Sequence, residues 1–214
     1  MYNSINILFN KGSKYMKYTR AITLLFASFL VVGCANSNGS QNIMKRENLR
    51  PIAYNAINSP FADYTLEYLN KIRLTGSNCA NATTPLNYNV ALEAAAMAHA
   101  KDMALNRHLE HDGSGTNVDI AKQNYGGSKF YERILYFGYP AKPNDLVGEG
   151  VTYTTYKAYK TKDIKKLYKY AVDRLMKDYE HCKIIMNPRF RDVGVGYYQA
   201  KDRVYWVLDF GETE

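Results

Sequence analysis

The chain has 214 residues, with 28 lysines and arginines against 20 aspartates and glutamates, a formal net charge of +8. Four of the basic residues and no acidic one precede Cys34, so the part that follows carries 24 against 20, or +4. A charge this small and scattered, without a recognised nucleic-acid-binding motif, argues against a nucleic-acid partner. It supports at most a weak attraction to anionic surfaces of the cell envelope.

Residues 1–33 predict an export signal. The stretch 21–33 (AITLLFASFLVVG) is apolar and uncharged, and it follows Lys17 and Arg20. It is too short to span a bilayer, which needs about 20 apolar residues. A basic start, a short apolar centre and small residues at its end are typical of a secretory signal. Met16 directly precedes the basic residues and is an alternative start of the protein.

Residues 31–34 (Val-Val-Gly-Cys) resemble the bacterial lipobox, in which the cysteine is acylated and becomes the new N-terminus. We therefore expect Cys34 to carry a lipid anchor with palmitate-like chains and the protein to reside in the cell envelope. Ala35 follows the cysteine, which points to the outer membrane if the cell has two membranes. The alternative is a plain cleaved signal, with Cys34 an incidental thiol. Residues 34–59 are rich in Asn and Ser and predict a flexible tether.

Residues 60–214 predict one globular domain, with a core large enough for independent folding. Pro60 is suited to a first helical position, and the helix that it opens can end at Gly76. A second, alanine-rich helix is expected from about Asn89 to Arg107, and a short third one over 129–136. A strand is expected over 146–154.

A fourth helix is expected over 163–179, where Leu167, Ala171 and Leu175 are spaced by four residues. Residues 193–199 and 203–210 then predict an antiparallel hairpin around the turn at 200–202. Helices that alternate with strands and then precede a hairpin favour an α+β fold with a mainly antiparallel sheet over a parallel doubly wound one.

Cys79 and Cys182 remain after the signal. In an exported chain an even pair of cysteines predicts a disulfide bond. The alternative is a nucleophilic dyad of Cys182 with His181, although adjacent residues rarely present both side chains to one substrate.

His111, Glu149 and His181 are the residues that can carry chemistry. His111 leaves the second helix next to a glycine-rich turn, Glu149 lies between two glycines, and His181 follows the fourth helix. Two imidazoles and a carboxylate are competent ligands for Zn²⁺ or another divalent cation, and a fourth position left to water would make the site open. The alternative is that these residues are hydrogen-bonded polar side chains that line a groove. His99 lies on the apolar stripe of the second helix and is expected to be a core histidine.

Taken in order, these segments resemble the CAP superfamily (cysteine-rich secretory proteins, antigen 5 and pathogenesis-related proteins, also called SCP-like) in its bacterial form. The resemblance covers about residues 61–211. The matching residues are Leu69-Asn70-Lys71-Ile72-Arg73, Pro85-Leu86-Asn87-Tyr88-Asn89, Leu92 through Met103, His111-Asp112-Gly113-Ser114, Arg133 with Gly138-Tyr139, Gly148-Glu149, His181-Cys182, and Gly194-Val195-Gly196-Tyr197 with Phe210-Gly211.

The resemblance implies a three-layer α-β-α sandwich with a surface cleft that in many members holds two histidines and two acids, and in some a divalent metal. His111 and His181 match the histidines, and Glu149 matches the first acid. Asp178 and Glu180 are the nearest candidates for the second acid. The chain departs from the family at Gly150, where Asn is usual, and at residues 178–180, which replace a Ser-Pro-Gly run.

Two functions remain. The resemblance favours a lipid-anchored, non-enzymatic binding module for an apolar ligand, an envelope component or a protein partner. The alternative is a zinc-dependent peptidase or esterase that uses the same residues, with Glu180 as a proton shuttle. A third interpretation is an envelope-stabilising protein with a vestigial cleft.

Overall fold

The computed structural model describes residues 60–122 and 126–212. The predicted export signal, the lipid anchor at Cys34 and the tether lie outside the described residues. Within them, the elements are α1 (Pro60–Thr75), β1 (Asn87–Tyr88), α2 (Val90–Asn106), α3 (Phe130–Tyr136), β2 (Val147–Thr155), α4 (Tyr156–Tyr159), α5 (Ile164–Lys177), α6 (Tyr179–Ile185), β3 (Asp192–Ala200) and β4 (Arg203–Gly211).

The strands form one sheet in the order β1-β3-β4-β2. β4 pairs antiparallel with both β3 and β2 over their full lengths, whereas the two residues of β1 pair parallel with β3. β3 and β4 form the predicted hairpin, and Lys201 in its turn has a left-handed backbone with φ of 57°. The prediction of a mainly antiparallel sheet is confirmed, with one short parallel pair at its edge.

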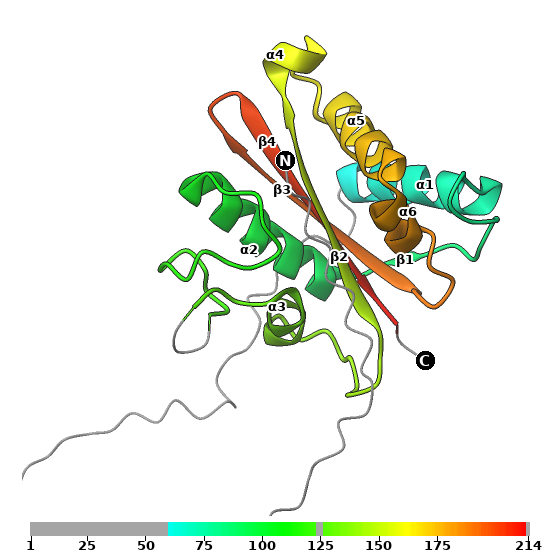
Figure 1. Ribbon diagram of the computed structural model, residues 1–214, viewed down its shortest axis with the longest axis horizontal. Helices are drawn as coiled ribbons and strands as arrows, with labels where there is room; N and C mark the ends of the chain where they lie inside the picture. The colour runs from blue at the N-terminus through cyan, green and yellow to red at the C-terminus, as the bar shows by residue number, and fades with distance from the viewer. Residues whose placement is uncertain (1–59, 123–125, 213–214) are drawn as a thin grey trace, which may run out of the picture. The chain divides into compact units, whose positions relative to one another are not determined.

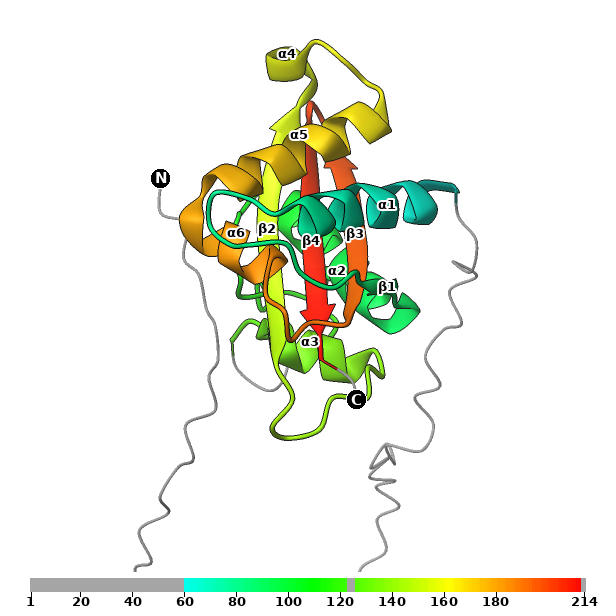
Figure 2. The same ribbon diagram turned by 90° about the vertical axis from the view of Figure 1, so that its right-hand side faces the viewer.

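Helices cover both faces of the sheet. α2 and α3 lie on one side of the strands, and α1, α5 and α6 lie on the other (Figures 1 and 2). The larger apolar cluster lies under α1 and α5 and includes Leu69, Leu167 and Trp206, none of which is exposed. A smaller one joins Ala96, Ala100 and Met103 of α2 to the other face. The expected three-layer α-β-α sandwich is therefore confirmed.

α2 begins and ends where its sequence predicts. The Asn89 side chain accepts hydrogen bonds from the backbone N–H groups of Ala91 and Leu92, which satisfies donors that a helix start leaves free. Arg107 ends the helix in a left-handed conformation with φ of 55°. The alanines between them let α2 pack close to β3.

The fourth predicted helix, over 163–179, is α5, and a separate helix, α6, follows it directly; this difference matters for the site. Asp178 has extended backbone angles and its carboxylate accepts from His181 N–H, so it ends α5 and caps α6. Aspartate competes with the helix for backbone hydrogen bonds, which explains a break inside an apolar-periodic run. Neither α6, the single turn α4 nor the two-residue β1 was expected from the sequence.

Gly196 lies where β3 passes under α2, and a Cβ there would overlap backbone atoms of Ala96 and Met97. We expect Gly196→Ala to lower the free energy of unfolding by about 3 kcal/mol, because the helix must move off the sheet. Gly150→Ala in β2 is the matched control: its nearest neighbour, Leu175 Cδ1, would be 3.6 Å from the new carbon. The control should change stability by less than about 1 kcal/mol. If both variants lost the same free energy of unfolding in urea, the result would contradict a close approach of α2 to β3 at Gly196.

Candidate functional site

The structure brings His111 and Glu149 into direct contact. His111 follows α2 and Glu149 is the third residue of β2, and both are almost fully buried. His111 Nδ1 lies 2.8 Å from Glu149 Oε1. This contact joins the loop after α2 to the edge strand β2, so two of the three predicted site residues share one hydrogen bond.

Arg133 of α3 holds this pair together. Its guanidinium donates to Glu149 Oε2 at 2.7 Å and to the backbone oxygen of His111 at 2.8 Å. It also donates to the backbone oxygen of Ser128 at 2.8 Å. The sequence places Arg133 among the family-like residues but assigns it no role in the site. A short helix with one arginine gives no sign that the arginine points inward.

The carboxylate of Glu149 is ionised at neutral pH although it is buried. Burial alone would raise its pKa, but the charge of Arg133 and the neighbouring rings of His99 and His111 outweigh burial and hold the pKa at about 2. Both oxygens are already engaged, one by His111 and one by Arg133. Glu149 is therefore an anchor for these two side chains and a weak proton acceptor.

Asp209 lies directly opposite Glu149 in the β2–β4 ladder and is completely buried. Burial, followed by the negative charge of Glu149, raises the pKa of Asp209 well above its usual value. The protonated form of the Asp209 carboxyl is thus favoured over the charged form, since two adjacent buried carboxylates repel each other. Nothing in the sequence marks Asp209 as a site residue, because its pairing partner follows only from the strand register.

His99 is the core histidine that was expected. It is 1% exposed, and its Nε2 lies 2.8 Å from the backbone oxygen of Glu110. Burial lowers its pKa to about 4, so the ring is neutral at neutral pH. Its Nε2 is also 3.9 Å from Glu149 Oε2, so the His99 ring is a neighbour of this carboxylate.

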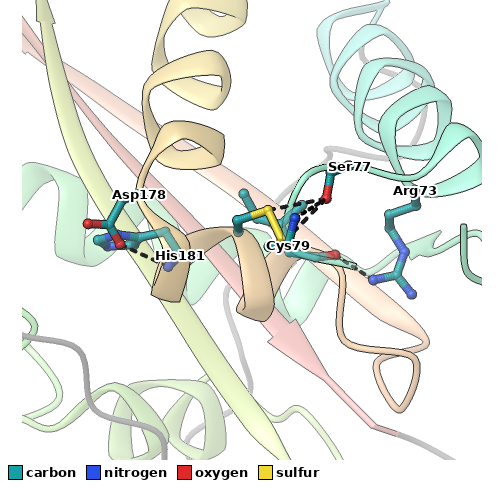
Figure 3. The surroundings of a disulfide bond; sticks show 7 residues. Arg73, Ser77, Cys79, Asp178 and His181 are labelled. Atoms are coloured by element: carbon teal, nitrogen blue, oxygen red, sulfur yellow. Dashed lines mark hydrogen bonds and ion pairs between the residues drawn. A yellow bond between two sulfur atoms is a disulfide. The ribbon is translucent and has the colours of Figure 1, made fainter. Parts of the chain in front are cut away.

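His181 is the third predicted site residue, and it reaches the same region from α6. Its Nδ1 lies 2.9 Å from Asp178 Oδ1 (Figure 3), and its ring centroid lies 6.4 Å from that of His111 with 23° between the planes. Burial lowers the pKa of His181, and Asp178 partly offsets this. Of the two candidates for the second acid, Asp178 contacts the histidine, whereas Glu180 is exposed.

The Nε2 atoms of His111 and His181 have no hydrogen-bond partner among the described residues, although both are buried. Each ring has its Nδ1 beside a carboxylate oxygen. The site is therefore a pair of roughly parallel imidazoles, each held by one acid, with one free nitrogen apiece. Within residues 60–122 and 126–212, no group of three or more His, Cys, Asp or Glu side chains is arranged to hold a metal ion.

The position of His181 depends on a disulfide bond at the next residue. Cys182 is bonded to Cys79, and the Ser77 hydroxyl lies 3.3 Å from both sulfurs (Figure 3). This bond ties α6 to the loop after α1. The predicted disulfide is confirmed, and the alternative dyad of Cys182 with His181 is wrong because the sulfur is not a free thiol.

Arg73 strengthens the same junction. Its fully buried side chain donates to the backbone oxygen of Thr84 at 2.8 Å and to that of Asn187 at 3.1 Å. Together with the disulfide bond, Arg73 holds α6 and the segment after it against α1 and the loop that follows α1.

A family model described as the cysteine-rich secretory protein family, CAP, matches residues 66–210, which is most of the chain. The chain belongs to the CAP family. No curated protein sequence matches this CAP domain.

Solved structures with the same fold include an extracellular SCP-domain protein from Bacillus anthracis str. Ames, at 18% identity and a TM-score of 0.50. That match covers 71% of this chain but only 40% of the Bacillus protein, so the CAP domain spans less than half of its length. An outer surface protein from Borrelia burgdorferi is 14% identical, with 72% and 90% of the two chains covered and a TM-score of 0.49. NaASP2, solved with Zn²⁺, is 13% identical over 73% and 82%, with a TM-score of 0.47. At these identities the comparisons support the fold alone.

Proposed function

We propose that this CAP domain is a lipid-anchored binding module of the cell envelope, and that the His111–His181 pair takes a divalent cation or a polar group of a bound partner. The observation that carries the proposal is the pair of buried imidazoles, each with Nδ1 beside a carboxylate and Nε2 unpartnered. A buried polar atom without a partner is costly, so two of them on neighbouring rings favour a group bound at the ring edges that carry these nitrogens.

The residues present fit a zinc ion in part. Histidines that bind metals almost always give their second nitrogen to a carboxylate or carbonyl, and both rings show this arrangement. His111 and His181 would hold the metal through Nε2, while Glu149 and Asp178 would orient the rings. A bound zinc ion supplies Lewis acidity and activates water. Two protein ligands would leave the remaining positions to water or to a group of the partner.

Location outside the cytoplasm is part of the proposal. It rests on the basic and apolar segment before Cys34 and on the lipobox-like residues 31–34. The disulfide bond between Cys79 and Cys182 agrees with it, because such bonds persist in oxidising compartments. The Bacillus protein of the same fold is described as extracellular, which agrees with the proposed location.

The alternative function is a zinc-dependent peptidase or esterase at the same two histidines. Hydrolysis needs a group that accepts a proton from the attacking water. Both Glu149 oxygens are engaged and its pKa is about 2, while Asp178 contacts His181 and Glu180 is exposed. These carboxylates are poorly suited to this role, which favours binding over hydrolysis.

Zinc binding tests the proposal. We expect native mass spectrometry of the soluble chain from Ala35, titrated with Zn²⁺, to show one zinc ion per chain. His111→Ala and His181→Ala should each lose it, because each removes one of the two Nε2 atoms of the pair. His108→Ala, a half-buried histidine outside the pair, is the matched control and should keep it.

Zinc that survives in both variants, or no specific zinc in the unaltered chain, would contradict the metal part of the proposal. Peptidase or esterase activity of the zinc-loaded chain that disappears in both variants would favour the alternative function. Ligand binding without such activity would support the binding module.

A further inference from the structure

The positive charge of the described residues gathers at one end of the sheet. This end, here called the basic end, consists of Arg107, residues 156–166 and residues 200–203. It carries eight lysines and arginines against two aspartates, a net charge of +6. The other described residues carry 13 against 16, a net charge of −3. The mild overall charge therefore conceals a strong separation of charge between this end and the other described residues, which only the fold brings out.

Strand pairing brings the three parts of the basic end together. Thr155, the last residue of β2, pairs with Arg203 at the start of β4, and the Tyr156 N–H donates to the Asp202 backbone oxygen at 3.0 Å. α4 thus begins beside the β3–β4 turn, and Figures 1 and 2 show both at the same end of the sheet. A cavity of about 360 Å³ lies between this turn and the end of α2, and Arg107, Lys201 and Arg203 are among its lining residues.

The cationic side chains of this end are available to a partner. All eight lysines and arginines are exposed. Among the described residues, none of Lys157, Lys160, Lys162 and Lys166 forms an ion pair. The Asp163 carboxylate accepts from the backbone N–H groups of Lys165 and Lys166, because it caps α5, and so competes little for lysine ammonium groups.

Aromatic rings accompany these charges. Tyr159 of α4 and Tyr170 of α5 stack with ring centroids 4.5 Å apart, which fixes α4 against α5. Tyr170 is 37% exposed. Tyrosine rings lie favourably at the boundary between water and lipid, since one end is apolar and the other is polar.

We propose that the basic end docks on the surface of an anionic phospholipid membrane. This inference rests on the proposed envelope location, but it concerns a different surface from the His111–His181 pair. Lysines near an anionic leaflet each add a favourable contribution of roughly fivefold in partitioning. Thr155, at the basic end of β2, pairs with Arg203, whereas Glu149 pairs with Asp209. Thr155 lies six residues along β2 from Glu149, which is about 20 Å at the usual rise of a strand. Docking at the basic end therefore leaves Glu149, which contacts His111, about 20 Å along the strand from the docked end.

Vesicle co-sedimentation tests the surface. All three core clusters and the disulfide bond lie within residues 61–210, so the soluble chain from Ala35 keeps every contact described here. We expect this chain to bind vesicles of phosphatidylglycerol mixed equally with phosphatidylcholine, and not vesicles of phosphatidylcholine alone. Binding should weaken as salt rises, because the screening length falls from about 10 Å at 0.1 M to about 3 Å at 1 M.

A charge-matched pair of variants decides where the membrane binds. Replacing Lys157, Lys160 and Lys162 with glutamine should lower partitioning about a hundredfold. The control variant replaces Lys71, Lys101 and Lys183, exposed lysines of α1, α2 and α6, with glutamine. It changes the net charge by the same amount, but it should lower partitioning to the vesicles less than threefold. Both triple variants alter only exposed side chains, and matching thermal unfolding would confirm that they fold.

Equal losses in the two triple variants would overturn the proposal, since net charge alone would then explain binding. Binding of duplex DNA at the same salt, without binding to anionic vesicles, would also overturn it. Zinc binding by the unaltered chain is independent of these outcomes, so failure of the docking surface and failure of the proposed function are distinguishable.

Discussion

Replacing both Cys79 and Cys182 with alanine should lower the free energy of unfolding by about 4–5 kcal/mol. The bond closes a loop with a sequence separation of 103 residues. In the chain-entropy account, its loss lets the unfolded chain explore many more conformations, and the gain rises with loop length. The stability should be measured by urea unfolding of the soluble chain from Ala35.

The same variant should loosen α6, because Cys182 is next to His181 and the sulfurs pack against Ser77. The distance between the His111 and His181 rings would then vary, and zinc binding should weaken along with stability. Reductant provides the control: it should destabilise the unaltered chain by a similar amount and leave the cysteine-free variant unchanged. A loss below about 1 kcal/mol would show that other contacts, such as those of Arg73, hold α6 by themselves.

Replacing Arg133 with methionine should cost about 3–5 kcal/mol, because it leaves the Glu149 charge buried without its cationic partner. The N···O distance in this ion pair is 2.7 Å, and both side chains are almost fully buried. Arg189→Met is the matched control, since Arg189 forms an ion pair with Glu212 at 2.6 Å in which the arginine is half exposed. An exposed pair contributes about 0–1 kcal/mol, so the control should lose no more than that.

The pH dependence separates the lost charge pair from a general packing defect. In the unaltered chain the pKa of Glu149 is lowered to about 2, so its stabilising contribution is present above the unfolded value of 4.5 and is lost as pH falls toward 2. In Arg133→Met the buried carboxylate lacks that partner, and protonation relieves the penalty. The cost of the substitution should therefore be largest at pH 7 and shrink below about pH 4.5.

Adding Glu149→Gln to the Arg133→Met variant completes a double-mutant cycle. The double variant should recover part of the stability that Arg133→Met loses, since no unpaired charge remains buried. A cost that is the same at pH 4 and pH 7, with no recovery in the double variant, would contradict the role assigned to this ion pair.

Local patterns in the sequence were enough to predict several helices and strands of this protein, its family and its disulfide bond. The cap at Asn89, the alanine-rich period of α2 and the turn after Ala200 each depend on residues within a few positions, so the helix and the β3–β4 hairpin could be predicted. The order of weak motifs along about residues 61–211 predicted the CAP family and its fold, and the family model over residues 66–210 confirmed the family. An even pair of cysteines after a predicted export signal predicted the disulfide bond, and His111, Glu149 and His181 were singled out by residue type.

Only the tertiary structure decided how these residues work. The carboxylate of Glu149 is held by Arg133 and lies opposite Asp209, and both neighbours follow from strand register and helix packing rather than from spacing in the sequence. Asp178 became the partner of His181 because it caps an unexpected helix, α6. The basic end likewise joins three separate segments that meet only when β2, β3 and β4 pair. Contacts between residues distant in the chain depend on the packed fold, and no local pattern encodes them.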